Sequence, residues 1–483
     1  MISKNFIKSS AIYTIAGSLP VASAIILMPF YGELPSQVYG MFSIYVGFSL
    51  LVQILVTYSF DASIYINFHE YKNDPKQLAK FISSAFVFVL LLSLAIGAVL
   101  AIGGNWIFKT VYGEGNIPFL PFGVLSVGSG VFQALFKINN SLLQTQSKPT
   151  QFLWGNVFSF SFIAIFTIVG LKLFPDSLWG PIGGKLLGVL ISAAWVLAGI
   201  YRQFGIHFDW KLLKTTFSFN TPSLIYQIQQ WFINYYDRIL LLAIILSKST
   251  VAYYDVALKF LLAIDFILTG LNSTIHPKVL GKVNDQQIKS STIEINRYYN
   301  GMTAIAILAV TGSLLVFPPV IHLFFNSDYH AAIPLLPLAA IIYLMRPLRL
   351  YMAMPYAALK YSKPLPVYYL FLAALKIGVM YFLIHRWGVW GALISSLIAY
   401  VFEIMLLYFG IRGKFSFKIN VFKLVGAPVL LSVFILSLEP VWGNDYSLVL
   451  HVGYVVLGII ILFWAYRNEF NDIKKAFYTS VMK

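Results

Sequence analysis

The sequence predicts an all-α membrane protein of about fourteen transmembrane helices, arranged as two pseudo-symmetric six-helix bundles followed by two additional helices. Three observations predict this class. Of the 483 residues, 59% are hydrophobic and 11% are charged, whereas soluble domains carry about 25% charged residues. Apolar runs long enough to cross a bilayer recur with short polar links between them, and segments of the first half recur in the second. Such a chain needs the bilayer in place of a soluble core.

The apolar runs set the helix positions in order along the chain. Lys4 and Lys8 precede the first run. Because no A-x-A cleavage site follows it, we expect an uncleaved first span rather than a signal peptide. A crossing helix needs about 20 apolar residues. The predicted spans cover residues 11–31, 38–61, 81–103, 117–138, 151–172, 179–200, 220–246, 249–273, 301–323, 332–352, 365–385, 389–410, 424–440 and 448–466.

Lysine and arginine are distributed unevenly between the links. Alternate links place 26 of the 34 on one side of the membrane and four on the other, and the remaining four fall within spans. Lys137, Arg346 and Arg349 lie near span ends and are counted with the links; if they lie within the membrane, the ratio is 23 to 4. The positive-inside rule assigns the richer side to the cytoplasm, so we expect both termini there. The formal charge of +16 does not indicate a nucleic-acid partner, because the basic residues of a nucleic-acid binder gather on one face.

An internal repeat supports the two-bundle arrangement. Three pairs of segments match in the same order. Two are about 215 residues apart, 117–122 with 333–338 and 147–149 with 362–364, and the third, 179–184 with 387–392, has a slightly shorter offset. Because six helices separate the matching segments, the two halves have the same orientation, as in transporters built from parallel repeats. We therefore predict bundles at 1–215 and 216–415, with two further helices and a cytoplasmic tail at 416–483.

Ionisable residues within the predicted spans define the candidate site. A charge at the centre of the bilayer costs a few kcal/mol and normally faces a partner or a wet cavity. Buried cations outnumber the acids on their own helices, so we expect an anion in a central cavity between the bundles. The candidate binding residues are Lys376, Arg346, Arg349, Lys259, Lys185 and Lys137. The candidate coupling residues are Asp237, Arg238, Asp265 and Glu403.

Structural roles are open alternatives for several of these residues. Asp237 with Arg238, and Asp255 with Lys259, are spaced to form local ion pairs. The side chains of Lys137, Arg346 and Lys185 are long enough to extend to the headgroups. Lys376 is the hardest to explain in this way, because it lies near the middle of its span with no acid on the same predicted helix.

The sequence carries no sign of a catalytic or metal site. It has no cysteine, and its seven histidines lack ligand spacing. The segment 180–186 lacks the order of a phosphate-binding loop. We therefore expect no cofactor and no enzymatic activity, and the short outward links leave little room for an extracytoplasmic active site.

Several motifs resemble those of the polysaccharide (O-antigen) flippase family, which belongs to the multidrug/oligosaccharidyl-lipid/polysaccharide exporter superfamily. The likeness extends over the first twelve spans. Residues 321–332 follow the family pattern except that Asn326 stands where a glycine is usual. The other motifs are Tyr39-Gly40-Met41-Phe42-Ser43, Ser59-Phe60-Asp61, Asp237-Arg238-Ile239-Leu240-Leu241, the run 251–257, and His276-Pro277-Lys278-Val279.

This resemblance implies a flippase of the bacterial inner membrane. Its substrate would be an undecaprenyl-pyrophosphate-linked oligosaccharide, moved from the inner to the outer leaflet, with the pyrophosphate held by the buried cations. The other expected partners are membrane lipid and a counter-ion. By analogy with the family, this counter-ion is a proton or sodium ion that acts through Asp237, Asp265 or Glu403. The alternatives are a lipid II flippase and a cation-coupled multidrug exporter of the same superfamily. A membrane-embedded polysaccharide polymerase or ligase is a further alternative, disfavoured by the short outward links.

Overall fold

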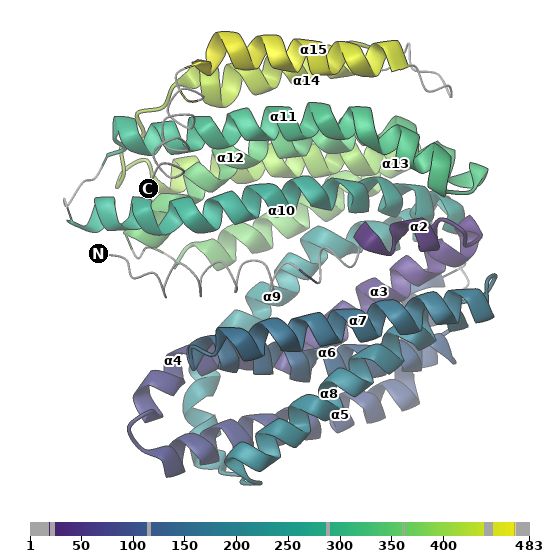
Figure 1. Ribbon diagram of the computed structural model, residues 1–483, viewed down its shortest axis with the longest axis vertical. Helices are drawn as coiled ribbons and strands as arrows, with labels where there is room; N and C mark the ends of the chain where they lie inside the picture. The colour runs from purple at the N-terminus through teal and green to yellow at the C-terminus, as the bar shows by residue number, and fades with distance from the viewer. Residues whose placement is uncertain are drawn as a thin grey trace. The chain divides into compact units, whose positions relative to one another are not determined.

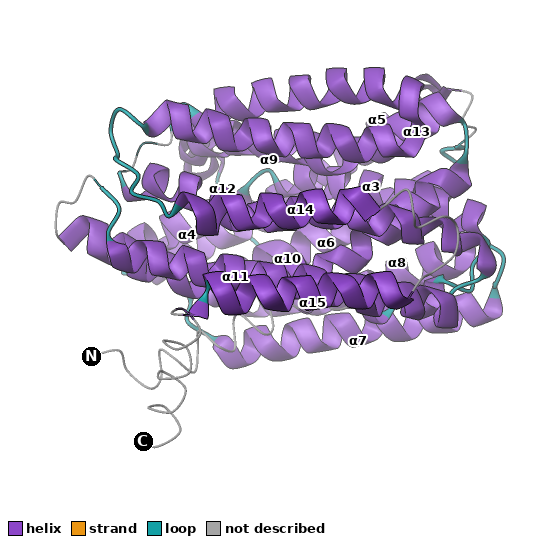
Figure 2. Cartoon of the chain, turned by 90° about the horizontal axis from the view of Figure 1, so that it is seen from above, coloured by secondary structure: helices purple, strands orange, loops and turns teal. Residues whose placement is uncertain are grey.

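The computed structural model describes residues 19, 25–113, 117–285, 290–359, 361, 363–438, 448–467 and 469. Within these residues the chain forms helices joined by loops, as Figures 1 and 2 show, together with an isolated β-bridge between Ser290 and Ser416. The predicted all-α class is confirmed.

The chain divides into two compact units, residues 1–252 and 253–483. The first contains α2 (Met28–Tyr31), α3 (Ser36–Thr57), α4 (Phe60–Tyr71), α5 (Pro75–Tyr112), α6 (Phe122–Thr145), α7 (Pro149–Leu173), the π-helical turn η2 (Trp179–Gly183), α8 (Gly184–Phe204) and α9 (Trp210–Ile245). α10 (Lys248–Asp285) begins in the first unit and continues into the second. The second unit also contains α11 (Ile293–Phe324), the 3-10 helix η3 (Ser327–Leu335), α12 (Leu336–Ala358), α13 (Leu365–Ile411), the π-helical turn η4 (Phe422–Gly426), α14 (Ala427–Leu438) and α15 (Leu448–Ala465).

The helices coincide with the predicted spans from 38–61 onward, whereas most of the predicted span 11–31 lies outside the described residues. In the described part of the chain, seven helices are long and apolar enough to cross a membrane. The protein is therefore polytopic, and the total of fourteen crossings stays a prediction.

Polar side chains and prolines fix where several helices begin. The Asp74 carboxylate accepts hydrogen bonds from the backbone N–H groups of Lys76 and Gln77, at 3.0 and 3.1 Å, and Pro75 follows it. Asp209 and Thr292 cap α9 and α11 in the same way. These residues satisfy N–H groups that have no partner in the first turn of a helix.

α13 contains two of the predicted spans, 365–385 and 389–410. Gly388 separates them with φ +55° and ψ −133°, which is not a helical conformation. A residue with a side chain rarely adopts this region, and glycine adopts it readily. The structure thus places a sharp kink where the sequence predicts a short link.

The helix starts follow the repeat. α6 begins at Phe122 and α12 at Leu336, and α7 begins at Pro149 and α13 at Leu365. The compact units, however, divide at residue 252, and α9 packs in the first unit, where the Trp231 indole N–H donates to the Gly47 carbonyl at 2.8 Å. The predicted boundaries at 215 and 415 follow the internal repeat, whereas the compact units follow helix packing. The predicted boundaries stay a prediction.

Within the second unit, α15 packs against α11, and α14 packs against α12 and α15 (Figure 1). The Lys423 ammonium lies 2.7 Å from both carboxylate oxygens of Glu469, and Asn300 on α11 donates to the same carboxylate at 3.4 Å. Gly458 lies very close to Thr311: a Cβ added at Gly458 would be 2.8 Å from the methyl group of Thr311. A close approach of this kind between helices is typical of small residues in membrane proteins.

Candidate functional site

Arg346 on α12 connects two polar residues of α10. Its Nη1 lies 2.6 Å from Asp265 Oδ1, and its Nη2 donates to the Thr269 hydroxyl at 3.1 Å. Asp265 and Thr269 are four residues apart and therefore lie on one face of the helix. This polar face of α10 is directed at α12.

Arg349 lies one turn further along α12 and pairs with an acid from α13. Its Nη2 is 2.7 Å from Glu403 Oε1, and the guanidinium lies 5.8 Å from the centre of the Tyr400 ring. The side chains of Arg349 and Glu403 are 21% and 9% exposed. Mutual neutralisation lowers the cost of keeping these charges within a helical membrane bundle.

Two other members of the predicted set lie elsewhere in the second unit. Lys259 Nζ is 2.7 Å from Asp255 Oδ2, one turn earlier on α10, so the local ion pair is confirmed. Lys376 is buried in the first half of α13, with 7% of its surface exposed. A lysine at that depth is held at considerable cost, which keeps it a candidate for binding an anion.

Asp237 and Arg238 form the second predicted local pair, on α9 in the first unit. The Arg238 Nη1 is 2.7 Å from Asp237 Oδ1 and donates to the Asn234 carbonyl at 2.9 Å. The guanidinium also lies 5.3 Å from the centre of the Tyr235 ring. Both charged residues are buried, and pairing lowers the cost of burying each charge.

Lys137 on α6 also pairs with an acid from another helix. Its Nζ is 2.8 Å from Asp61 Oδ2 on α4 and 3.4 Å from the amide oxygen of Gln227 on α9. The Gln227 amide nitrogen in turn donates to the Ser59 hydroxyl at 2.8 Å. These four residues connect α4, α6 and α9 through side chains alone.

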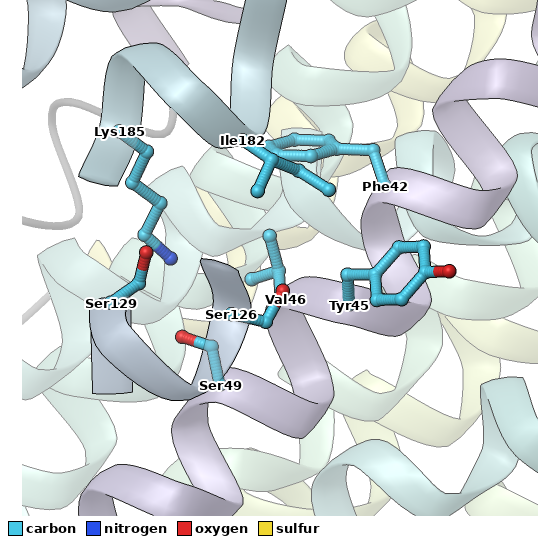
Figure 3. Close-up of a pocket in the computed structure, with 8 residues that line it drawn as sticks. All are labelled: Phe42, Tyr45, Val46, Ser49, Ser126, Ser129, Ile182 and Lys185. Atoms are coloured by element: carbon cyan, nitrogen blue, oxygen red, sulfur yellow. The ribbon is translucent and has the colours of Figure 1, made fainter. Parts of the chain in front are cut away.

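Lys185 lies at the wall of a small, open hollow in the first unit (Figure 3). Ser49, Ser126 and Ser129 supply hydroxyl groups to the same wall, and Phe42 supplies an aromatic face. The Ser49 hydroxyl is buried without a hydrogen-bond partner. The hollow has room for about one water molecule, which the lysine and hydroxyl groups can bind.

The structure provides partners for several of the buried cations that the sequence leaves without an acid on their own helix. The count of surplus cations included only acids on the same helix, whereas Asp61, Asp265 and Glu403 pair with cations on other helices. Arg346 and Arg349 are one turn apart on α12, so the structure brings them together with the two acids that pair with them. Sequence reasoning missed Asp61, although its position at the end of a predicted span was a signal. The binding and coupling roles of the ten predicted residues stay predictions.

Comparison with known proteins places this arrangement in a family. A family model described as polysaccharide biosynthesis protein matches residues 34–334. A Shigella flexneri protein named for O-antigen transport is 23% identical over 229 residues, or 47% of this chain and 54% of that protein. The chain thus matches about half the length of this curated relative.

Solved structures share the fold. The lipid II flippase MurJ in an inward closed conformation superposes with a TM-score of 0.71 at 17% identity, over 99% of this chain and 100% of MurJ. An inward-facing multidrug resistance MATE family transporter of the MOP superfamily gives 0.66 at 13% identity, over 82% of this chain and 95% of that one.

The apolar helices define a polytopic membrane protein, and its fold is shared with the lipid II flippase MurJ and with a MATE family transporter. Because the family model covers more than half of the chain, the protein belongs to the polysaccharide biosynthesis protein family. The resemblance to the polysaccharide flippase family is confirmed.

Proposed function

We propose that the protein is a flippase for an undecaprenyl-pyrophosphate-linked oligosaccharide, the repeat unit of an O-antigen, capsule or exopolysaccharide. It moves this substrate from the inner to the outer leaflet of the bacterial inner membrane by alternating access, and it catalyses no covalent step. Family membership and the name of the Shigella flexneri relative support the substrate class.

The observation that carries the proposal is the pair of arginines on α12. Arg346 and Arg349 are three residues apart, and each is held by a carboxylate from a different helix. A pyrophosphate carries more negative charge than a carboxylate and can also bind a guanidinium group through two oxygens, so it can compete with these carboxylates. The buried Lys376 supplies a further positive charge. Asp265 and Glu403 then hold the arginines in place when no substrate is bound.

Movement of the anion needs little additional energy. The cytoplasm is negative, so each negative charge that moves outward gains about 2.3 kcal/mol per 100 mV of membrane potential. The apolar tail stays in the bilayer, and the sugars cross in a hydrated cavity. A counter-ion bound at Asp237, Asp265 or Glu403 returns the transporter to its starting state in this proposal.

A lipid II flippase is the second candidate, and one observation favours it. The MurJ fold covers 99% of the chain, including α14 and α15, whereas the MATE transporter covers 82%. Both candidates carry a polyprenyl pyrophosphate and differ in the attached sugars. A multidrug exporter is disfavoured, because positive charge in the cavity would repel cationic drugs.

Gene deletion and complementation distinguish the two candidates. Deletion in the source bacterium should abolish a surface polysaccharide and cause its lipid-linked repeat unit to accumulate, and expression of the intact chain should restore export. The same chain should fail to support growth of cells depleted of their lipid II flippase. Rescue of those cells together with an unchanged surface polysaccharide in the deletion strain would replace the first proposal with the second.

A further inference from the structure

The segment 412–421, which joins α13 to η4, has one packed face and one exposed face. Phe415 is buried, and Phe417 is partly buried, in a hydrophobic cluster with residues of α11, α12 and α13. Lys414 and Lys418, which alternate with them, are exposed. Such alternation is typical of an extended chain with one side against the protein, because successive side chains point in opposite directions. The segment therefore presents a defined set of side chains outward.

The link between α10 and α11 holds the backbone of this segment. Ser290 and Ser416 form the isolated β-bridge, and the Ser291 N–H donates to the Ser416 carbonyl at 3.0 Å. The Ser291 hydroxyl accepts from the Lys418 N–H at 2.6 Å and donates to the Lys418 carbonyl at 3.1 Å. The side-chain amide of Asn296 donates to the same carbonyl. The backbone of Lys418 is thus fixed at both its N–H and its carbonyl group.

The exposed face of the segment is basic. Arg412, Lys414 and Lys418 are exposed and lie close together in the sequence. No carboxylate in the described part of the chain forms an ion pair with any of the three, whereas the next cation, Lys423, is paired with Glu469. The positive charge of this face is therefore not balanced by a contact with an acid that the structure describes.

Aromatic rings support two of these cations without neutralising them. The Lys414 ammonium lies 3.7 Å from the centre of the Tyr361 ring, and the Arg412 guanidinium lies 4.9 Å from the centre of the Phe409 ring. A cation over the face of a ring is attracted by the ring's quadrupole and keeps its full charge. Both side chains are therefore positioned and still able to bind an anion.

The segment lies beside two apolar stretches. It begins where α13 ends, and α13 is one of the helices long and apolar enough to cross a membrane. A shorter apolar stretch, Phe422–Ser437, follows it. At the two ends of the segment, Phe409 and Val421 are more than half exposed. Basic groups next to exposed apolar groups suit the membrane surface, where lipid headgroups meet acyl chains.

We propose that Arg412, Lys414 and Lys418, called here the basic segment, bind the headgroup phosphate of an anionic phospholipid. Ammonium and guanidinium groups form charge-assisted hydrogen bonds with phosphate oxygens. Basic clusters next to a transmembrane helix attract anionic lipid. A lipid fits better than an acidic protein because its acyl chains can contact Phe409 and Val421. This site is separate from the residues proposed to hold the transported substrate, and it does not depend on the proposed function.

The test uses the purified full-length chain in detergent and dioleoylphosphatidylglycerol as the probe. Dioleoylphosphatidylcholine has the same acyl chains and no net charge, so it is the matched control lipid. The melting temperature is measured against the mole fraction of each lipid, and its rise gives an apparent dissociation constant. We expect phosphatidylglycerol to raise the melting temperature and phosphatidylcholine to have little effect. Hexaglutamate, added at equal charge, represents an acidic protein.

Two triple variants separate this surface from general positive charge. One neutralises the basic segment, and the other neutralises exposed lysines in the link between α4 and α5: Arg412→Gln/Lys414→Gln/Lys418→Gln and Lys72→Gln/Lys76→Gln/Lys80→Gln. The first should weaken phosphatidylglycerol binding about 100-fold, from about fivefold for each cation lost. The second removes the same charge and should bind like the wild type.

Ser291→Ala tests whether the fixed backbone contributes. This variant keeps every charge but loses both hydrogen bonds between the Ser291 hydroxyl and Lys418. We expect weaker binding of phosphatidylglycerol than in the wild type, by less than in the first triple variant. Unchanged binding would show that the surface is an unstructured cluster of charge, which contradicts the site described above. Gel filtration shows whether each variant is folded.

The remaining outcomes also decide the question. Equal stabilisation by the two lipids, or equal weakening in the two triple variants, overturns the site, because bulk lipid or net charge then explains the effect. Full binding by the first triple variant places the lipid elsewhere on the chain and overturns it as well. Stabilisation by hexaglutamate equal to that by phosphatidylglycerol would make the segment a docking surface for an acidic protein and the assignment to lipid wrong. All of these outcomes leave the proposed function standing.

Discussion

Arg349 and Glu403 lie 2.7 Å apart, although Glu403 belongs to the part of α13 that follows the kink at Gly388. The contact therefore joins α12 to the second segment of α13. Arg346, one turn earlier, joins α12 to α10. Through these two pairs a single helix face connects three helices, and a ligand that displaces either carboxylate alters how those helices are held.

Removing the acid from the first of these pairs should destabilise the protein. In Glu403→Ala, the largely buried Arg349 charge loses its partner, and we expect a loss of about 2 kcal/mol, below the value for fully buried pairs because Arg349 remains partly exposed. The double variant Arg349→Met/Glu403→Met should lose less, since no uncompensated charge remains. Thermal unfolding in detergent measures both, with the exposed Asp176→Asn as control. A Glu403→Ala protein as stable as the wild type would show that the pair has no structural role.

Lys376 should be needed for export rather than for folding. Lys376→Gln removes the charge at similar length, and we expect glycan export to be lost while membrane insertion and protein level are maintained. Lys376→Arg should restore part of the activity, because charge matters more than shape for a point contact with phosphate. Surface glycan in a deletion strain is the measurement, with immunoblotting of membranes as control. Normal export by the Gln variant would remove Lys376 from the binding site.

The kink in α13 depends on close backbone contact after Gly388. A Cβ at Gly391 would lie 2.2 Å from the Leu383 carbonyl oxygen, whereas a Cβ at Gly378 in the same helix would meet nothing within 4 Å. Gly391→Ala should therefore lower the melting temperature, by an amount equivalent to about 1–3 kcal/mol. Gly378→Ala should leave it unchanged. Equal melting temperatures for the two variants would mean that the kink adjusts without cost.

The predicted topology can be tested by labelling, because the chain has no native cysteine. Asn73→Cys, in the exposed link before α5, should be shielded from a membrane-impermeant maleimide in intact spheroplasts. Asp176→Cys, in the link after α7, should be labelled, because the positive-inside rule places these links on opposite sides. Permeabilised membranes provide the control for reactivity. Labelling of both residues in intact spheroplasts would overturn the assignment.

The positions of the helices could be predicted from the sequence, but the ion pairs between different helices could not. Apolar length determines a crossing helix and is local information. The pairs Asp255 with Lys259 and Asp237 with Arg238 are also local, and their spacing predicted them. Arg349 and its partner are 54 residues apart in the chain, and only helix packing brings them together.

The break between α3 and α4 could not be predicted from the sequence either. Tyr58 and Ser59, which separate the two helices, have φ 46° and 58°. Neither Tyr58 nor Ser59 is glycine or proline, so no turn signal in the residues marks it. Their left-handed conformation accompanies contacts with α9, including the 2.8 Å hydrogen bond between the hydroxyl groups of Tyr58 and Thr221. Tertiary contacts of this kind are absent from any local pattern.

Reconstitution tests the central claim most directly. The purified protein is inserted into vesicles that contain a fluorescent polyprenyl-pyrophosphate oligosaccharide in both leaflets, and a membrane-impermeant quencher reports the fraction that becomes accessible with time. We predict that the wild-type protein makes the inner-leaflet pool accessible much faster than protein-free vesicles do, and that the variant Arg346→Gln/Arg349→Gln/Lys376→Gln does not. Exchange no faster than in protein-free vesicles, or equally fast exchange by this triple variant, would contradict the account of an anionic lipid-linked substrate held by these three cations.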